Sequence, residues 1–219
     1  MTASLTLSPA AVLSDLDGVL VDSGDSIEVT WSAWARSVGI EPSSLLGSVH
    51  GRPARDVIAE FAPHLDAAAE DARVERMDIE GPPARLLPGA RELLMGSSVV
   101  GSSFAVVTSC PPQLGRVRIE TAGLPIPRVF VTSDRVTAGK PDPEGYLLAA
   151  GELGVAAEAC VVFEDAPAGV AAGAAAGATV VGITTTHAAG ELLAAGAAVC
   201  AADVAEALSL VAAARAGVR

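Results

Sequence analysis

Six short apolar segments recur along the chain, and each ends in a turn of polar, glycine or proline residues. They are AAVLSD (10–15), FAVVTS (104–109), RVFVTSD (128–134), CVVFED (160–165), TVVGIT (179–184) and AAVCAAD (197–203). Each is too short for a typical helix, and its apolar positions follow one another instead of alternating with polar ones. Continuous apolarity is typical of parallel strands that are covered on both faces. The pattern therefore predicts six buried strands.

Helical stretches separate the later strands. The clearest are GARELLMG (89–96), PEGYLLAAGELG (143–154) and AGVAAGAAAG (168–177). Alternating strands and helices are typical of a doubly wound parallel sheet with right-handed crossovers, so we expect an α/β fold with a Rossmann-like core. Ligands of such sheets bind beyond the carboxyl ends of the strands. The polar residues of this chain gather at those ends.

Residues 24–87 break the rhythm, because they hold helical patterns but no comparable strand. The patterns are SIEVTWSAWARSVG (26–39), RDVIAEFAPHL (55–65) and DAAAEDARVERMDIE (66–80), and the proline-rich GPPARLLPG (81–89) follows them. We predict a core domain made of residues 1–22 and 88–219. The inserted residues 23–87 are predicted to form a small α-helical cap domain, seated as a lid over the carboxyl edge of the sheet.

Composition and charge exclude several classes of partner. Of the 219 residues, 51% are hydrophobic and 18% charged, and the net charge is −12 without any cluster of lysine and arginine. Nucleic acids and anionic membranes are held mainly by basic patches, so neither is expected as a partner. No apolar run approaches the roughly 20 residues that cross a bilayer. The composition suits a soluble protein, and a monomer is a plausible state.

The cysteines and the N-terminus indicate a cytoplasmic protein. Cys110, Cys160 and Cys200 are far apart and odd in number, and they match neither a disulfide framework nor a zinc spacing. No basic residue precedes the first apolar stretch, so the N-terminus does not resemble a secretory signal.

The first strand ends in LSDLDG, which places two carboxylates one residue apart. In an extended chain, the side chains of Asp15 and Asp17 point to the same face, so both enter one site. Like charges at close range are unfavourable, so a cation or a shared proton belongs there. An EF-hand is excluded, because the positions that need glycine and glutamate hold Leu20 and Ser26.

Other strand ends supply complementary groups. Glu164 and Asp165 follow the CVVF strand and could offer oxygen ligands to Mg²⁺. The hydroxyls of Thr108 and Ser109 follow another strand, where free backbone N–H groups can face an anion. Lys140 lies in the turn AGKPDP. Taken singly, the acidic pair could be an ordinary helix cap, the hydroxyls could be ordinary strand-end groups, and Lys140 could be a solvated loop lysine. Their ordered recurrence at strand ends predicts a functional site.

At these residues the chain resembles the haloacid dehalogenase superfamily of aspartate-nucleophile phosphotransferases. The resemblance runs from about Ala11 to about Asp203, and the helical insertion resembles the C1-type cap of that superfamily. The segments SVHGRPARDVIAEFAPHL (48–65) and VVFEDAPAGVAAGAAAGATVVGITTTH (161–187) are similar to parts of glycerol-phosphate and 2-deoxyglucose-6-phosphate phosphatases.

The resemblance implies roles for the strand-end residues. Asp15 would be the nucleophile that becomes an aspartyl phosphate. Asp17 would protonate the leaving alcohol and then deprotonate the attacking water. A neighbouring carboxylate and burial under a closed cap would both raise its pKa for this task. Thr108, with Ser109, would hold a phosphate oxygen, and Lys140 would link Asp15 to the phosphate.

The same resemblance implies a magnesium site and a small phosphate-ester substrate. Asp15, Asp165 and the backbone carbonyl of Asp17 would ligate Mg²⁺, and Glu164 would do so directly or through water. Two positions depart from the family's pattern: Ser14 stands where a large apolar residue is usual, and Cys110 where Gly or Asn is more common.

The cap is expected to select the substrate. In the loop HGRPAR, we expect Gly51 and Arg52 to contact it through backbone or guanidinium donors. Arg55 is expected to face solvent, and the role of His50 is left open. Trp31 and Trp34, three residues apart on a helix, are expected to pack inside the cap.

Three functions remain after these considerations. The first is a Mg²⁺-dependent phosphatase of small sugar or polyol phosphates. The second is a hexose phosphomutase like β-phosphoglucomutase, whose members carry a histidine ten residues after the second aspartate; that position is Ile27 here, which favours hydrolysis. The third is an inactive phosphate-binding regulatory protein, which the intact set of site residues disfavours. Dehalogenation is also disfavoured, because the dehalogenases lack an acid at the position of Asp17.

Overall fold

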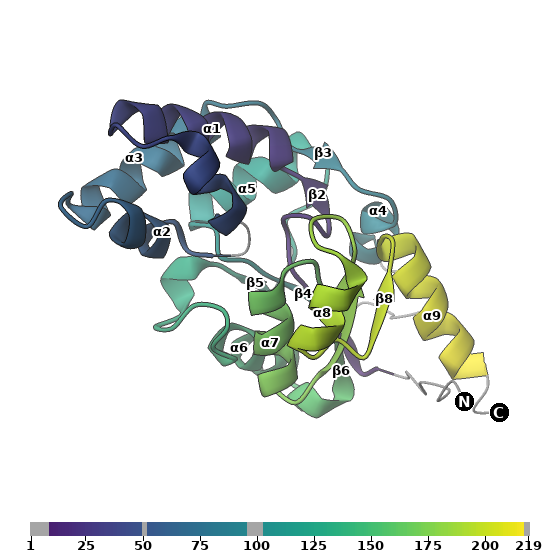
Figure 1. Cartoon of the computed structure of the whole chain (residues 1–219). Helices are drawn as coiled ribbons and strands as arrows, with labels where there is room; N and C mark the ends of the chain where they lie inside the picture. The colour runs from purple at the N-terminus through teal and green to yellow at the C-terminus, as the bar shows by residue number, and fades with distance from the viewer. Residues whose placement is uncertain (1–8, 50–51, 96–102, 217–219) are drawn as a thin grey trace.

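A six-stranded sheet forms the centre of the molecule (Figure 1). The computed structural model describes residues 9–49, 52–95 and 103–216. The strands of the sheet are β1 (Ala11–Ser14), β4 (Phe104–Val107), β5 (Phe130–Val131), β6 (Cys160–Glu164), β7 (Thr179–Ile183) and β8 (Val199–Ala201). Their spatial order is β5-β4-β1-β6-β7-β8, and all neighbouring pairs are parallel. The predicted strands and the parallel sheet are confirmed.

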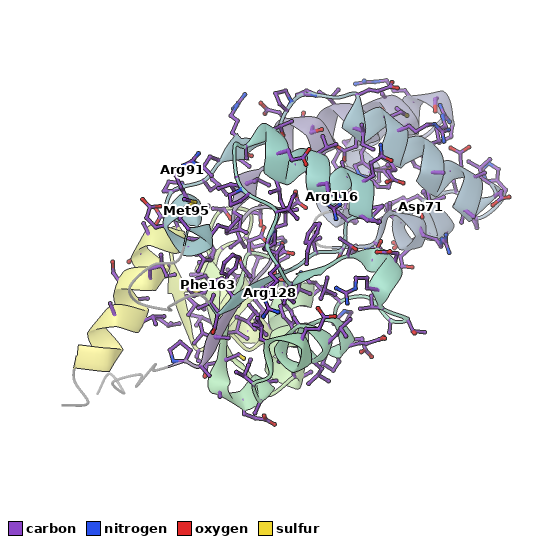
Figure 2. All side chains as sticks on the ribbon, turned by 180° about the vertical axis from the view of Figure 1, so that it is seen from behind. Asp71, Arg91, Met95, Arg116, Arg128 and Phe163 are labelled. Carbon is purple, nitrogen blue, oxygen red and sulfur yellow. The ribbon has the colours of Figure 1, made fainter. Side chains whose placement is uncertain are left out.

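Helices cover both faces of the sheet. One face carries α4 (Ala90–Leu94), α5 (Pro112–Thr121) and α9 (Val204–Ala216), and the other carries α6 (Glu144–Leu153), α7 (Pro167–Ala175) and α8 (Ala189–Ala195). Successive residues of β1 enter different hydrophobic clusters, because Val12 packs on the first face and Leu13 on the second. This two-sided burial explains why the strands read as continuous apolar runs; Phe163 of β6 lies inside the core (Figure 2).

A helical segment stands apart from the sheet with its own hydrophobic cluster. It contains α1 (Gly24–Ser37), α2 (Ala54–Phe61) and α3 (Ala67–Ile79), with short 3-10 turns at Pro42–Ser44 and Leu46–Ser48. Trp31 and Trp34 are buried in this cluster, where their rings meet edge to face with centroids 5.4 Å apart. Each buried aromatic ring removes a large apolar area from water, so the pair anchors α1 to the other two helices. We call residues 23–87 the cap segment.

A two-stranded antiparallel ribbon carries the chain between sheet and cap segment. It pairs β2 (Val21–Asp22) with β3 (Arg85–Leu86), at the two points where the cap segment begins and ends. Both strands lie outside the six apolar segments, so the sequence pattern did not predict them. Across the described ranges, no helix combines the length and apolarity that crossing a lipid bilayer demands.

Candidate active site

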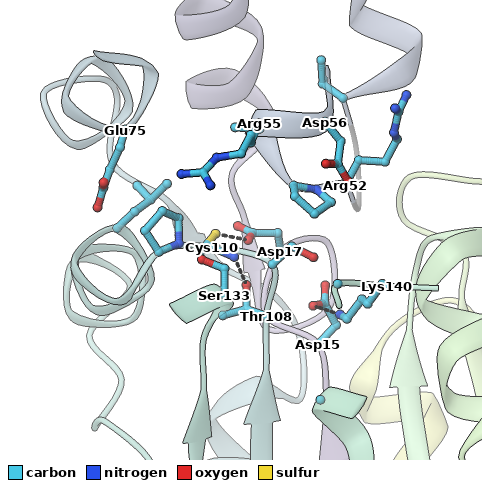
Figure 3. A pocket seen from close by; sticks show the side chains of 18 of the residues that line it. Asp15, Asp17, Arg52, Arg55, Asp56, Glu75, Thr108, Cys110, Ser133 and Lys140 are labelled. Carbon is cyan, nitrogen blue, oxygen red and sulfur yellow. Dashed lines mark hydrogen bonds and ion pairs between the residues drawn. The ribbon is translucent and has the colours of Figure 1, made fainter. Parts of the chain in front are cut away.

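The polar groups of three neighbouring strands converge below a cavity. Strand β1 lies between β4 and β6, so Asp15, Thr108 and Glu164 come together although they are far apart in sequence. This is the point where the strand order reverses, the usual ligand position in a doubly wound sheet. A cavity of about 660 Å³ lies between these strand ends and the cap segment, with Arg52, Arg55 and Asp56 above it (Figure 3).

A buried ion pair lies on the floor of this cavity. The ammonium Nζ of Lys140 donates to Asp15 Oδ1 at 2.5 Å and to Glu164 Oε1 at 2.6 Å. Lys140, the only lysine in the sequence, also donates to the carbonyl oxygen of Val107. Burial and the neighbouring carboxylates of Glu164 and Asp17 together raise the pKa of Asp15 to about 7, against the opposing effect of Lys140. One cation therefore serves more carboxylates than it can neutralise.

The unbalanced carboxylates fit a divalent cation. Oxygen atoms of Asp15, Glu164 and Asp165 lie within 4.8 Å of one another, and all three residues are buried. Burial raises the pKa of Asp165 well above its usual value, and Asp15 and Glu164 add to that shift. Hard divalent cations prefer such oxygen donors.

Glu164 is the member of this cluster with the least freedom. Its Oε1 accepts from Lys140 and from the Tyr146 hydroxyl, the latter at 2.7 Å. Its Oε2 accepts from the backbone N–H groups of Asp165 and Ala166. Both carboxylate oxygens of Glu164 are therefore already engaged by donors of the protein.

The raised pKa of Asp15 predicts how stability varies with pH in metal-free protein. Its pKa is 3.8 without partners and about 7 in the fold, so between these pH values the folded chain holds a proton that the unfolded chain has lost. Stability therefore falls as pH rises through this window, by an amount of the order of a few kcal/mol. We expect a higher melting temperature near pH 5 than near pH 8 in EDTA, and a flatter profile for Asp15→Asn. The exposed Glu41→Gln is the control and should keep the wild-type slope; an equally steep profile for Asp15→Asn would contradict this assignment.

Helix α7 shapes the floor of the site through a glycine. A Cβ at Gly169 would overlap the carboxylate of Glu164, which is 1% exposed and has no room to retreat. We expect Gly169→Ala to displace Glu164, loosen Lys140 and lower kcat/KM at least about 10-fold, with a loss of 1–3 kcal/mol, roughly, in stability. Gly151→Ala in α6 is the matched control, because its Cβ would meet open space; it should leave activity unchanged and stabilise the protein slightly. Equal behaviour of the two variants in kinetics and thermal unfolding would contradict the prediction.

The environment of Asp17 differs from the expectation. Arg118 Nη1 lies 2.6 Å from Asp17 Oδ1, and the Ser23 hydroxyl donates to the same oxygen at 2.6 Å. The Cys110 thiol donates to Oδ2 at 3.1 Å (Figure 3). Burial raises the pKa of Asp17, but the Arg118 guanidinium and these hydrogen bonds outweigh burial and hold the pKa below its usual value. The expectation of a raised pKa is wrong for this conformation, because a cation from α5 reaches the carboxylate.

The two departures from the family's pattern are accommodated locally. The Ser14 side chain is buried, and its hydroxyl donates to the carbonyl oxygen of Asp15 at 2.7 Å. The backbone N–H of Cys110 donates to the Thr108 hydroxyl at 3.1 Å, which closes a tight turn after β4. Thr108 and Ser109 both line the cavity.

The cap segment contributes an acidic wall with two arginines. Arg52 lines the cavity, but its guanidinium is bound to Glu60 at 2.8 Å and its side chain is a third exposed. Arg55 also lines the cavity, is largely exposed and approaches Asp71 at 3.6 Å. His50 and Gly51 lie outside the described residues. A substrate role for Arg52 and Gly51 stays a prediction.

Sequence reasoning missed several residues that support the site. They are Arg118 and Asp78, which form a buried ion pair, Tyr146, which holds Glu164, and Thr186, whose hydroxyl donates to Asp165. None of these residues belongs to the motifs that predicted the site, which are the Asp-x-Asp, Thr-Ser, Lys-Pro and Glu-Asp pairs. The one available signal was an arginine among apolar residues in α5, at a position that the helical pattern buries.

Fold and site together define an α/β protein with a buried acidic cluster and one lysine at the carboxyl edge of a parallel sheet. The chain belongs to the haloacid dehalogenase-like hydrolase family, which it matches over residues 9–177.

Two named relatives and one solved structure show which members of this family the chain is similar to. Hexitol phosphatase A of Escherichia coli (strain K12) is 45% identical over 175 residues, which cover 78% of this chain and 81% of that protein. 2-Deoxyglucose-6-phosphate phosphatase 1 of Saccharomyces cerevisiae is 35% identical over 200 residues, 80% of each chain. A HAD family hydrolase from Deinococcus radiodurans, crystallised with phosphate and sodium, is 28% identical with a TM-score of 0.72, covering 95% of this chain and 97% of that one. The close relatives are thus phosphatases of the same hydrolase family.

Proposed function

We propose that this chain is a Mg²⁺-dependent phosphatase of small sugar or polyol phosphates, with Asp15 as its nucleophile. The observation that carries the proposal is the buried Asp15–Lys140 pair, 2.5 Å long, on the floor of a cavity of about 660 Å³. A carboxylate needs no proton removed before it attacks phosphorus, and a covalent intermediate divides one difficult displacement into two. Named relatives that hydrolyse hexitol and 2-deoxyglucose phosphates support the substrate class.

The reaction can be written with the residues present. An Asp15 oxygen attacks phosphorus, and the bond to the leaving oxygen breaks. Asp17 supplies the proton that converts this oxygen to an alcohol, for which it has to be in the protonated form that Arg118 disfavours in the present conformation. A water then attacks the aspartyl phosphate and gives its proton to the Asp17 carboxylate, which frees Asp15 and inorganic phosphate. Lys140 and Thr108, with Ser109, would hold the phosphate oxygens while charge moves between them.

Mg²⁺ is proposed as the cation of the acidic cluster. Asp15 and Asp165 would hold it together with the Asp17 backbone carbonyl, and Glu164 would position this set through water or hydrogen bonds. When bound, the ion would neutralise charge on the transferring phosphate.

The charge of the cavity wall favours a neutral, hydroxyl-rich leaving group. Asp56, Asp71 and Glu75 line the cap side. The two arginines there are each near a carboxylate: Arg52 is paired with Glu60, and Arg55 lies 3.6 Å from Asp71. Carboxylates accept hydrogen bonds from hydroxyl groups, but they repel a second phosphate or a carboxylate on the substrate. Polyol and sugar monophosphates fit this wall better than bisphosphates or phosphorylated acids.

Phosphate release from a panel of esters, with Mg²⁺ or EDTA, tests the proposal. We expect metal-dependent release concentrated on one or two of mannitol 1-phosphate, glycerol 3-phosphate, 2-deoxyglucose 6-phosphate and glucose 6-phosphate. EDTA should abolish turnover and Mg²⁺ should restore it. Release that is fastest from phosphoglycolate or a bisphosphate, or that is unchanged by EDTA, would overturn the substrate class or the metal assignment.

A phosphomutase is the weaker alternative. Ile27 lies in the cavity wall on α1 and has no group that can transfer a proton. Bisphosphate-dependent conversion of β-glucose 1-phosphate to glucose 6-phosphate, without phosphate release, would favour the mutase.

We also propose the cap as a separate domain of residues 23–87, and a cytoplasmic monomer. The separate hydrophobic cluster supports the first, and the free Cys110, Cys160 and Cys200 are consistent with a reducing compartment. Sedimentation velocity and limited proteolysis at the β2–β3 ribbon test the oligomeric state and the domain boundary.

A further inference from the structure

A buried arginine joins the catalytic loop to the cap segment. The two terminal nitrogens of Arg118 bind different carboxylates: Nη1 lies 2.6 Å from Asp17 Oδ1, and Nη2 lies 2.6 Å from Asp78 Oδ2. The side chains of Arg118 and Asp78 are 7% and 5% exposed, respectively. Arg118 belongs to α5 of the core, whereas Asp78 lies in the last turn of α3 in the cap segment.

We propose that Arg118 is a positioning residue that ties the Asp17 carboxylate to the cap through Asp78. The placement of Asp17 and the docking of the cap on the core then depend on each other. The inference rests on the proposed function insofar as Asp17 is the proton donor and acceptor of the reaction.

The cap end of this bridge is itself held firmly. The Ser26 hydroxyl on α1 donates to Asp78 Oδ1 at 2.5 Å, while Arg118 occupies the other carboxylate oxygen. Asp78 is therefore fixed by α1 from one side and by the core helix α5 from the other. A movement of the cap away from the core would pull Asp78 off Arg118 and leave the guanidinium with Asp17 alone.

The charges make the loss of either partner of the bridge costly. One guanidinium serves two carboxylates, and all three groups are largely shielded from water. Buried charges are tolerated only when they are paired and hydrogen-bonded. Loss of the arginine would therefore leave the carboxylates of Asp17 and Asp78 buried without this cation to balance them. A planar guanidinium can bind two carboxylates in fixed directions, whereas a lysine ammonium acts as a point charge.

The test compares two substrates in a set of variants. Arg118→Met and Arg118→Lys remove the bridge, Asp78→Asn removes the charge of its cap end, and the double variant combines Arg118→Met with Asp78→Asn. Arg116→Met, exposed on the same helix (Figure 2), and Glu80→Gln, exposed at the end of α3, are the controls. Mannitol 1-phosphate has a poor leaving group that needs a proton, whereas p-nitrophenyl phosphate releases a stable anion that does not.

Arg118 favours the ionised form of Asp17, so a loss of rate on removing Arg118, confined to the substrate that needs a proton, would report lost placement of the Asp17 carboxyl group. We expect Arg118→Met to lower kcat/KM, which reports the first step, about 100-fold on mannitol 1-phosphate, within the usual contribution of general acid–base catalysis, and less than about 5-fold on p-nitrophenyl phosphate. The second step, in which Asp17 accepts a proton from water, is common to both substrates and therefore affects kcat on both. Asp78→Asn should also impair hydrolysis of mannitol 1-phosphate more than that of p-nitrophenyl phosphate, with a smaller loss of kcat/KM. The double variant should be no worse than Arg118→Met, because both changes break one bridge. The kcat/KM of Arg118→Lys on mannitol 1-phosphate should lie between the values of Arg118→Met and wild type. If Arg118→Met does not fold, Arg118→Lys takes its place in the comparison.

Hydrogen exchange of the α3 segment tests the cap end without any substrate. We expect faster exchange over residues 71–81 in Arg118→Met and Asp78→Asn, and wild-type exchange in both controls. Unchanged exchange, equal losses on the two substrates, or losses that multiply in the double variant would each overturn the inference. If wild type hydrolyses no sugar or polyol phosphate, the proposed function fails, whereas the exchange result still decides whether Arg118 docks the cap.

Discussion

Asp15→Asn should remove turnover almost completely while leaving the fold intact. The amide cannot form an aspartyl phosphate, and a lost nucleophile commonly costs at least about 10⁴-fold in kcat. The variant also relieves repulsion, because Asp15 lies within 4.8 Å of the carboxylate oxygens of Glu164 and Asp165. We therefore expect melting temperature near pH 8, measured in EDTA, to be equal to or above that of wild type.

Rapid quenching with radiolabelled substrate distinguishes the chemical role from a structural one. Wild type should show a transient acid-stable phosphoenzyme, and Asp15→Asn should show none. The exposed Asp142→Asn, which lies near the same cavity, is a control for removal of one nearby carboxylate. Retained turnover or retained phosphoenzyme in Asp15→Asn would remove Asp15 as nucleophile.

Lys140→Met should impair both catalysis and stability. The ammonium is the cation between Asp15 and Glu164, so its loss leaves two facing carboxylates without a partner. Removing one side of a buried ion pair costs about 3–5 kcal/mol, and losing one charge-stabilising donor costs about 10²–10³-fold in kcat. The loss of stability should be smaller near pH 5 than near pH 8, because Asp15, with its pKa of about 7 set mainly by burial, is protonated at the lower pH.

Denaturant unfolding at both pH values and steady-state kinetics check this prediction. Arg128→Met, which removes an exposed cation of the core domain, is the control. It should change neither the free energy of unfolding nor kcat/KM. Because the chain has a single lysine, ¹⁵N-lysine labelling yields one ammonium resonance, which should move when phosphate and Mg²⁺ are added. Wild-type kcat/KM in Lys140→Met would assign this lysine a purely structural role.

The local sequence determined the sheet, the helices and the strand-end groups. These strands are buried on both faces, so the apolar run of each is continuous and its end is marked by polar residues, as at Ser14-Asp15, Thr108 and Glu164. Parallel topology then requires these ends to meet at one edge of the sheet. Proximity of the predicted residues therefore followed from periodicity and chain order alone.

Only the tertiary structure decided how the carboxylates are balanced. Arg118 reaches Asp17 from a different helix, and Asp78 reaches Arg118 from the cap segment, 40 residues away in sequence. No local pattern encodes such contacts, because they depend on how α5 and α3 are rotated and packed. A pKa reflects the sum of burial and all nearby charges, so one unforeseen guanidinium reversed the shift expected for Asp17. The sequence thus specified which strand-end groups meet, and helix packing decided which cation balances the Asp17 carboxylate.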